Sequence, residues 1–343
     1  MSSRTFTQRR WLPLLLIGIG VVWLLGTLGV FSGASVRILL TYWPLLLIGF
    51  GLDYLLGRNR ELDVSYSVLA VGVLVLLMLV GPLVGMGRGP QATEEQFREP
   101  LGDTKRVDVN LNIDVVPVEV RPLGEDDLLF SADIRDPGQV DLRVRGGNRK
   151  TIDLERAGRL GSFSDTDARW QLALTPEIPV SLDVDGGSAP ATLDLSALQL
   201  AGFDIDAEAG PIDLTLPETP DPYRGEIEMG AGSLDITVAE GARFELDIDA
   251  GNGSLSLDLE RDVALDLSLD AESGSVDIRF ASGSAVRLEI DDDGPGMVSV
   301  GGGLEHVRGS GDTGVWQTPG FGDAERQIVI EIDDVGAGPI SVR

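Results

Sequence analysis

Four acidic residues recur at a nearly constant spacing in the C-terminal half of this 343-residue chain. They are Asp206, Glu228, Asp249 and Asp270, and each stands four residues before a glycine. If the repeats stack, neighbouring carboxylates in this column lie about 4.8 Å apart and repel by about 1 kcal/mol in water. Such a column is either a solvated outer face or a binding site for divalent cations. The repeats lack the GGxGxD spacing of calcium-binding β-rolls, which favours the solvated face.

Other side chains that could carry catalysis are scarce. The chain has no cysteine and a single histidine, His306, so a His-rich metal site is excluded. A serine triad would have to combine His306 with Ser310 and Asp312, and nothing in the sequence orients these three, so an exposed loop histidine is favoured. Pairs of acids could cleave polysaccharide in a β-helix, but the acids repeat uniformly and few aromatic residues are available to bind sugar rings. We therefore expect no catalytic residue, no metal ion and no cofactor.

The glycines at the centre of these repeats indicate the fold. Gly210, Gly232, Gly253 and Gly274 follow one another at spacings of 22, 21 and 21 residues. Apolar and polar residues alternate on both sides of each glycine, which is the period of a strand with one buried face. Each unit is therefore predicted to be strand, tight turn and strand, with glycine accepting the turn conformation. A phosphate-binding loop is disfavoured because no helix follows these glycines.

Like residues recur in columns when the repeats are aligned. This predicts a β-solenoid with repeats of about 21 residues from 107 to 343, with an antiparallel sandwich or meander as the alternative. Residues 145–169 and 294–323 are less regular and are expected to be long loops or decorated edges, and the short end at Val342–Arg343 offers little cap. The apolar columns are Phe203, Gly225, Leu246 and Leu267; Ile205, Ile227, Ile248 and Leu269; Ile212, Leu234, Leu255 and Val276; Leu214, Ile236, Leu257 and Ile278; and Leu216, Val238, Leu259 and Phe280.

The N-terminal quarter has a different character. Residues 11–31, 36–57 and 64–86 are apolar runs close to the length that crosses a bilayer, which predicts a membrane region from 11 to 86 and a juxtamembrane linker from 87 to 106. The first run could instead be a cleaved signal peptide. Retention is favoured because PLLLIGIGVVWLLG at Pro13–Gly26 matches PLLLIGFGLDYLLG at Pro44–Gly57 at ten of fourteen positions, as in a duplicated helix. Asp53, near the end of its run, is expected to reach the headgroups or an arginine.

Charge predicts the orientation of the chain. Three spans place five arginines on one side of the membrane and two on the other, so residues 1–10 are expected in the cytoplasm and the β domain outside it. Residues 1–90 carry a net charge of +4, whereas residues 91–343 carry 20 basic and 52 acidic side chains, a net charge of −32. A domain this acidic would repel nucleic acid.

Two groups of motifs resemble a known family. The segments LLLIGIGVVWLLGTLG and YWPLLLIGFGLDYLLG resemble the LiaI-LiaF-like transmembrane region, and GAGSLDITV, GNGSLSLDL and ESGSVDIRF resemble the toast-rack β-solenoid, also found in candidate adhesins. The resemblance implies a right-handed, β-helix-like solenoid in a LiaF-like cell-wall-active antibiotics response protein. It further implies a bacterial membrane protein that modulates an envelope-stress two-component system, with no catalytic residues to transfer.

Two hypotheses of function follow. The first is a non-enzymatic membrane regulator whose helices contact the bilayer and a partner such as a sensor kinase, while the solenoid recognises a protein or an envelope component. The alternative is a membrane-anchored adhesin or self-assembling scaffold. Its solenoid would bind polysaccharide or surfaces, or form homo-oligomers through its terminal rungs.

Overall fold

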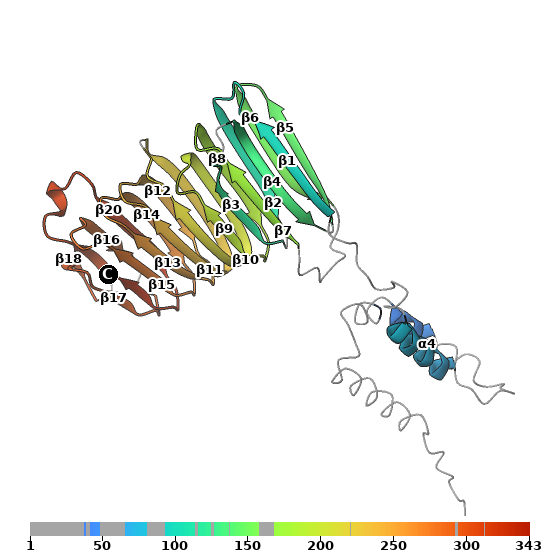
Figure 1. Ribbon diagram of the computed structural model, residues 1–343. Helices are drawn as coiled ribbons and strands as arrows, with labels where there is room; N and C mark the ends of the chain where they lie inside the picture. The colour runs from blue at the N-terminus through green and yellow to red at the C-terminus, as the bar shows by residue number, and fades with distance from the viewer. Residues whose placement is uncertain are drawn as a thin grey trace, which may run out of the picture. The chain divides into compact units, whose positions relative to one another are not determined.

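The computed structural model describes residues 38, 42–48, 66–80, 93–113, 116–124, 127–136, 138–157, 168–219, 221–291, 294–311 and 313–343. The chain divides into two compact units, Met1–Gln91 with Ser162–Asp165, and Ala92–Gly161 with Thr166–Arg343 (Figure 1). We call the second the β unit, and each unit is described by itself.

The first unit contains one long described helix, α4 (Tyr66–Val80). It lies inside the predicted span 64–86 and is apolar from Val68 onward, with Val71, Val73 and Leu76 exposed. None of the helices in the described residues has both the length and the apolar character needed to span a bilayer. The predicted span 11–31 lies outside the described residues, and only residues 38 and 42–48 of the predicted span 36–57 are described, so the three-helix region stays a prediction.

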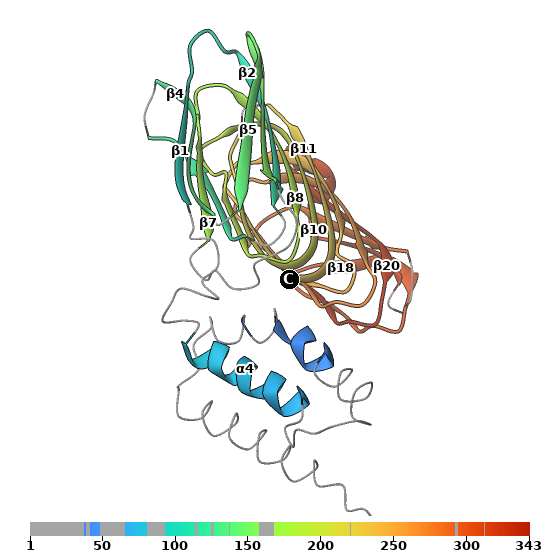
Figure 2. The ribbon, with the colours of Figure 1, turned by 90° about the vertical axis from the view of Figure 1, so that its right-hand side faces the viewer.

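The β unit is built from two rows of parallel strands (Figures 1 and 2). Two long strands, β10 (Gln199–Leu216) and β11 (Tyr223–Val238), run through both rows. In spatial order, row A otherwise contains β6 (Arg149–Ala157), β2 (Arg106–Ile113), β8 (Pro179–Gly186), β12 (Arg243–Asp249), β14 (Ala264–Ala271), β20 (Ile328–Val335) and β16 (Val286–Ile290). Row B contains β7 (Arg169–Leu174), β3 (Val118–Pro122), β9 (Ala191–Asp194), β13 (Ser254–Leu259), β15 (Val276–Phe280), β21 (Ile340–Val342) and β17 (Val298–Val300).

One strand of each row makes a rung, and the rungs do not all follow chain order. The first rung, β2 with β3, lies between β6 with β7 and β8 with β9. The last rung in the sequence, β20 with β21, lies between β14 with β15 and β16 with β17. The expectation that the chain end at Val342–Arg343 is an exposed last strand is therefore wrong, because β21 has a parallel neighbour on each side.

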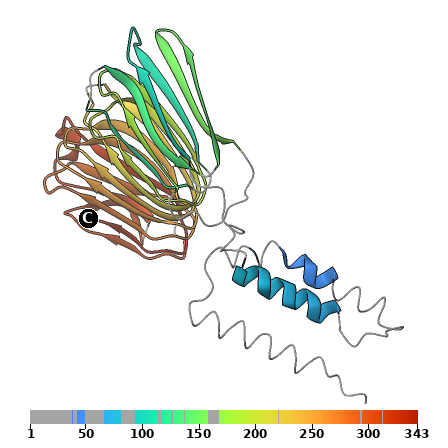
Figure 3. The ribbon, with the colours of Figure 1, turned by 45° about the vertical axis from the view of Figure 1, so that its right-hand side comes forward.

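Antiparallel strands cover most of the ends of the two rows (Figure 3). At the first end, β5 (Gln139–Gly146) pairs with β6, and β4 (Leu128–Asp136) with β1 (Thr93–Pro100) extends row B beyond β7. At the other end, β19 (Thr313–Gln317) pairs with β16, β18 (Glu305–Ser310) pairs with β19, and the short helix η2 (Phe321–Asp323) follows. Charged residues on β1 and a register shift in β18 make these edges poor templates for further strands.

Some irregular segments are more ordered than predicted. Residues 145–169 were expected to be a long loop or a decorated edge, and β6 occupies part of them, pairing with β2 in row A and with β5 at its edge. Within 294–323, the hairpin of β18 and β19 confirms a decorated edge. Strand β1 lies inside the segment 87–106 that was expected to be a linker.

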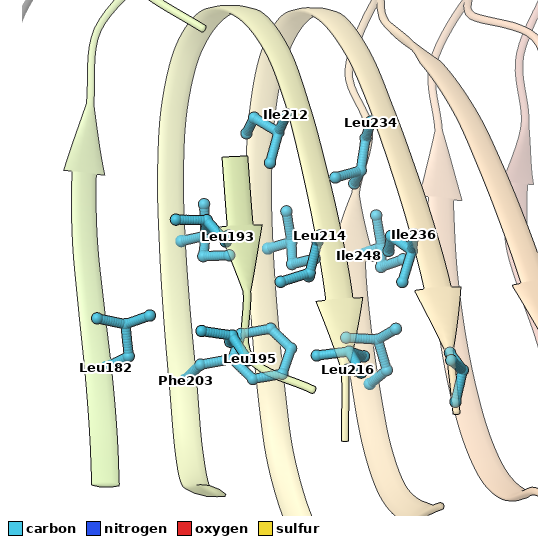
Figure 4. Close-up of a cluster of buried hydrophobic side chains, with 14 of the residues drawn as sticks. Leu182, Leu193, Leu195, Phe203, Ile212, Leu214, Leu216, Leu234, Ile236 and Ile248 are labelled. Atoms are coloured by element: carbon cyan, nitrogen blue, oxygen red, sulfur yellow. The ribbon is translucent and has the colours of Figure 1, made fainter. Parts of the chain in front are cut away.

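The predicted columns form the core, as Figure 4 shows for the middle rungs. Main-chain pairing aligns Ile212 with Leu234, Leu234 with Leu255, and Leu255 with Val276. All four side chains are buried. The 21-residue parallel register predicted from the sequence is confirmed at these positions, which excludes the antiparallel sandwich for these rungs.

Gly225 interrupts one apolar column for a steric reason. The register places it beside Phe203, and a Cβ atom on Gly225 would lie 2.1 Å from Cζ of the Phe203 ring. Phe203 thus fills the space of two side chains. Its ring lies 6.2 Å from that of Tyr223, which stacks on Phe244 at 5.2 Å.

The repeat glycines form a column of close backbone contacts. A Cβ atom on Gly232 would lie 2.3 Å from the carbonyl oxygen of Gly210, and one on Gly274 would lie 1.4 Å from that of Gly253. The column continues through Gly338 and Gly296, in the spatial order of the rungs. The predicted tight turn is wrong for the first two repeats, because β10 and β11 pass through Gly210 (φ 148°) and Gly232 (φ 127°) without ending.

We expect Gly274→Ala to lower the free energy of unfolding by at least about 3 kcal/mol, because its methyl group would displace the backbone of Gly253. Gly124→Ala is the matched control, since no atom lies within 4 Å of its Cβ position, and its effect should stay within about 0.5 kcal/mol. Denaturant unfolding of the full chain measures both. Equal effects of the two substitutions would contradict the stacked-glycine contact.

Candidate functional site

The outer face of row A carries the acidic columns. Strand pairing aligns Asp206 with Glu228, Glu228 with Asp249, and Asp249 with Asp270. A second column aligns Asp183 with Asp204, Asp204 with Glu226, and Glu226 with Asp247. We call these two columns the acidic face. The sequence-predicted residues are therefore brought together at the expected register.

Amide and arginine side chains offset the negative charge at the first end of this face. Asn110 Nδ2 donates to Asp153 Oδ1 at 2.7 Å, and Asn112 Nδ2 donates to Asp185 Oδ2 at 2.7 Å. Arg145 also forms an ion pair with Asp153. Its hydrogen bond lowers the pKa of Asp153, with the Asn110 hydrogen bond acting in the same direction and burial opposing both.

Within the described part of the chain, few arginine side chains reach the middle of the face. Arg224 lies 3.6 Å from Asp247 and 3.9 Å from Glu245, and all three side chains are largely exposed. Partial desolvation raises the pKa of Asp183, and the negative charges of Asp204 and Asp185 add to the rise. The middle of the acidic face is therefore under like-charge repulsion, which solvent screens.

Row B presents a mixed outer face instead. The acids Asp213 and Asp235 are aligned, but Ser256 separates Asp235 from Asp277. Asp277 also lies 3.0 Å from Arg343. Repulsion is therefore concentrated on row A.

The structure brings no cation-binding cluster together at the predicted acids. In the part of the chain that the structure describes, no three acidic or histidine side chains are grouped closely enough to hold a metal ion. Cation binding by Asp206, Glu228, Asp249 and Asp270 stays a prediction.

The single histidine lies on the edge strand β18. His306 is exposed, and its ring lies 5.0 Å from that of Trp316 on β19. Ser310 pairs with Thr313 at the end of the same hairpin, and Asp312 lies outside the described residues. His306 therefore makes a tilted aromatic contact with Trp316, at an interplanar angle of 50°.

A buried carboxylate at the first end of the β unit was missed from the sequence. Asp136 is 1 % exposed and accepts hydrogen bonds from Trp170 Nε1 at 3.0 Å and from the Gly138 amide at 2.6 Å. Arg156 Nη2 lies 3.1 Å from the same carboxylate. Asp136, Arg156 and Trp170 come from three separate strands, so no local spacing could have indicated the cluster. It fastens the β4–β5 connection to β6 and β7.

Parallel rungs with charged outer columns define a repeat protein of the stacked β class. Residues 11–88 match the family described as the LiaF transmembrane domain, and residues 88–237 match the one described as the N-terminal domain of toast_rack. The chain is therefore a membrane-associated, LiaF-like protein with a toast-rack domain, as the sequence motifs predicted.

Comparison with other proteins adds two solved structures. One is a candidate cell adhesion protein from Clostridium sporogenes, 14% identical with a TM-score of 0.40, and the match covers 74% of this chain and 99% of that one. The other is a candidate adhesin from Bacteroides fragilis, 10% identical with a TM-score of 0.35, covering 74% and 99%. The search of curated proteins gave no match.

We expect Asp183→Asn to raise the unfolding midpoint at neutral pH. The folded state raises the pKa of Asp183 above its ordinary value, so its charged form opposes folding at neutral pH, and that cost disappears as the pH falls through the raised pKa. The advantage of Asp183→Asn over wild type should therefore shrink in acid. Thermal unfolding between neutral pH and about pH 4, near the ordinary pKa of aspartate, measures it.

Asp258→Asn is the control for this prediction, because Asp258 has a favourable partner, Arg279, at 3.2 Å. It should leave the midpoint unchanged or lower it slightly. A midpoint raised equally by both substitutions would show that net charge, rather than the crowding around Asp183, sets the effect.

Proposed function

We propose that this chain is a non-enzymatic modulator of bacterial envelope-stress signalling. Its helices would contact the bilayer and a membrane partner such as a sensor kinase, and its right-handed β-solenoid would recognise a protein or an envelope component. The observation that carries the proposal is the presence in one chain of a LiaF transmembrane domain and a toast-rack domain, adjoining at residue 88. The exposed apolar side chains of α4 support contact with lipid or with a membrane helix.

The rigidity of the β unit supports a recognition role. Its core is one continuous cluster from Val107 to Val342, so the outer side chains are held at fixed positions by buried neighbours. A surface held in this way can bind a partner with little loss of conformational entropy. The strong negative charge of the β unit favours a partner with a basic surface and disfavours nucleic acid.

The regulatory role is tested with an envelope-stress reporter in the bacterium that carries this chain. Deletion should change the threshold at which a cell-wall-active antibiotic induces the reporter. Gly124→Ala should restore the wild-type threshold, and Gly274→Ala should fail to restore it because its rungs cannot stack. Immunoblots of the membrane fraction control for the amount of each variant. A threshold unaffected by deletion would refute the proposal.

The orientation of the chain across the membrane can be tested by cysteine labelling, because the chain has no cysteine of its own. We expect Ser310→Cys, on the exposed strand β18, to react with a membrane-impermeant maleimide in cells whose cytoplasmic membrane is intact. The matched variant Ser3→Cys, in the predicted cytoplasmic terminus, should react only after that membrane is permeabilised. The reverse pattern would place the β unit in the cytoplasm and overturn the three-span topology.

A further inference from the structure

A hollow of about 390 Å³ opens on the side of the β unit where turns lead from row B into row A. In the regular rungs these turns lie at residues 239–242 and 260–263. Strand β20 is entered differently, from the β19 hairpin through η2, because its rung is inserted between β14 and β16. The turn stack is interrupted there. The neighbouring turns and the segment before β20 line the hollow, through Arg261, Asp262, Ser282, Ser284, Glu325 and Arg326.

Two of the residues that line the hollow are arginines, and basic residues are scarce in this part of the chain. Residues 175–343 contain 35 acidic side chains and only eight basic ones, all arginines. Five of the eight form ion pairs with acids: Arg224, Arg279, Arg287, Arg308 and Arg343. Among the described residues, the other three, Arg243, Arg261 and Arg326, have no such ion pair, and two of them, Arg261 and Arg326, line the hollow. Arginines without an acidic partner on so acidic a surface can bind an external anion.

Arg326 is positioned by the main chain. Its Nη1 donates to the carbonyl oxygen of Gly241 at 2.7 Å and to that of Asp262 at 2.5 Å. These bonds hold the guanidinium across two turns and use only one of its nitrogens. The remaining N–H groups keep the fork geometry that suits a carboxylate.

Asp262 occupies a position that the neighbouring turns give to glycine. Gly241, Asp262 and Gly283 recur at the same place in successive turns of the chain, with φ of 85°, 58° and 92°. Asp262 is the one residue other than glycine with positive φ among those described. A side chain in this conformation costs on the order of 1 kcal/mol compared with glycine. The sequence therefore keeps a carboxylate here against a conformational penalty.

We propose that the hollow binds a small acidic saccharide. The ligand carboxylate would pair with Arg261 and Arg326, and its hydroxyl groups would donate to the carboxylates of Asp262 and Glu325. Ser282 and Ser284 can donate and accept further hydrogen bonds. A bare inorganic anion fits less well, because the two carboxylates would repel it while contributing nothing. The volume lies within the usual range for small-ligand sites. This inference goes beyond the signalling role and does not depend on it.

The test is calorimetric titration of the full chain in lipid nanodiscs with digalacturonate. We expect saturable binding, weaker binding of the neutral analogue galactobiose, and none of inorganic phosphate. Absence of digalacturonate binding would overturn the proposal. Equal binding of phosphate would also overturn it, because the site would then be a simple anion site.

Three variants locate the binding. Arg261→Gln should weaken digalacturonate about tenfold to a hundredfold, as expected for a lost charge-assisted contact. Arg243→Gln is the matched control, because Arg243 is exposed, has no described acidic partner and lies outside the hollow, and it should bind like wild type. Asp262→Gly should weaken binding while keeping or raising the unfolding midpoint. Equal loss in Arg261→Gln and Arg243→Gln would place binding elsewhere and refute the site.

Discussion

Main-chain pairing at a fixed parallel register is the constraint on which the rest of this β unit depends. Each rung pairs with its neighbour at nearly the same residue of the repeat, so most side chains lie beside a residue of the same kind. This placement is favourable inside, where leucine and isoleucine columns merge into one core. The same placement also restricts the sequence, because a residue type that recurs in a column must fit beside another residue of its own type. The glycine column and the acidic face are the two consequences.

The glycine column shows how closely the backbones approach. Gly253, Gly274 and Gly338 follow one another with no room for a Cβ atom, so the chain can bend sharply at this edge. The contact between Phe203 and Gly225 shows the opposite case. The large Phe203 ring occupies the space that a side chain at Gly225 would fill. Both depend on neighbours that are distant in sequence. Variation at one rung is therefore coupled to the rungs on either side.

The periodicity of the sequence predicted the structural features that are local and repeated. The features that it missed arise from pairing between segments that are distant in the sequence. The apolar columns and the aligned acids Asp206, Glu228 and Asp249 were accessible, because alternation and a 21-residue spacing are visible in the sequence. The strand-through-glycine geometry of β10 was not, since glycine permits both a turn and an extended bend. The insertion of β20 and β21 between earlier rungs was also inaccessible, because Ile328–Val342 satisfies the same column pattern at several positions. The hollow beside Arg326 could not be predicted for the same reason, because the segment that leads into β20 lines it.

Insertion of the terminal rungs links stability to the creation of a site. A solenoid that ended at its last strand would leave that strand as an open edge, exposed to pairing with other chains. Placing β21 between β15 and β17 gives the chain end a partner on both sides. The same rearrangement brings the chain into β20 from a hairpin instead of a turn, and this breaks the turn stack. The break exposes Arg261 and leaves Asp262 in a position that glycine holds in the adjacent turns. Where the repeat is interrupted, a side chain need not match its neighbours in the adjacent rungs. The protein can therefore place individual side chains, such as Arg261 and Arg326, in a site there.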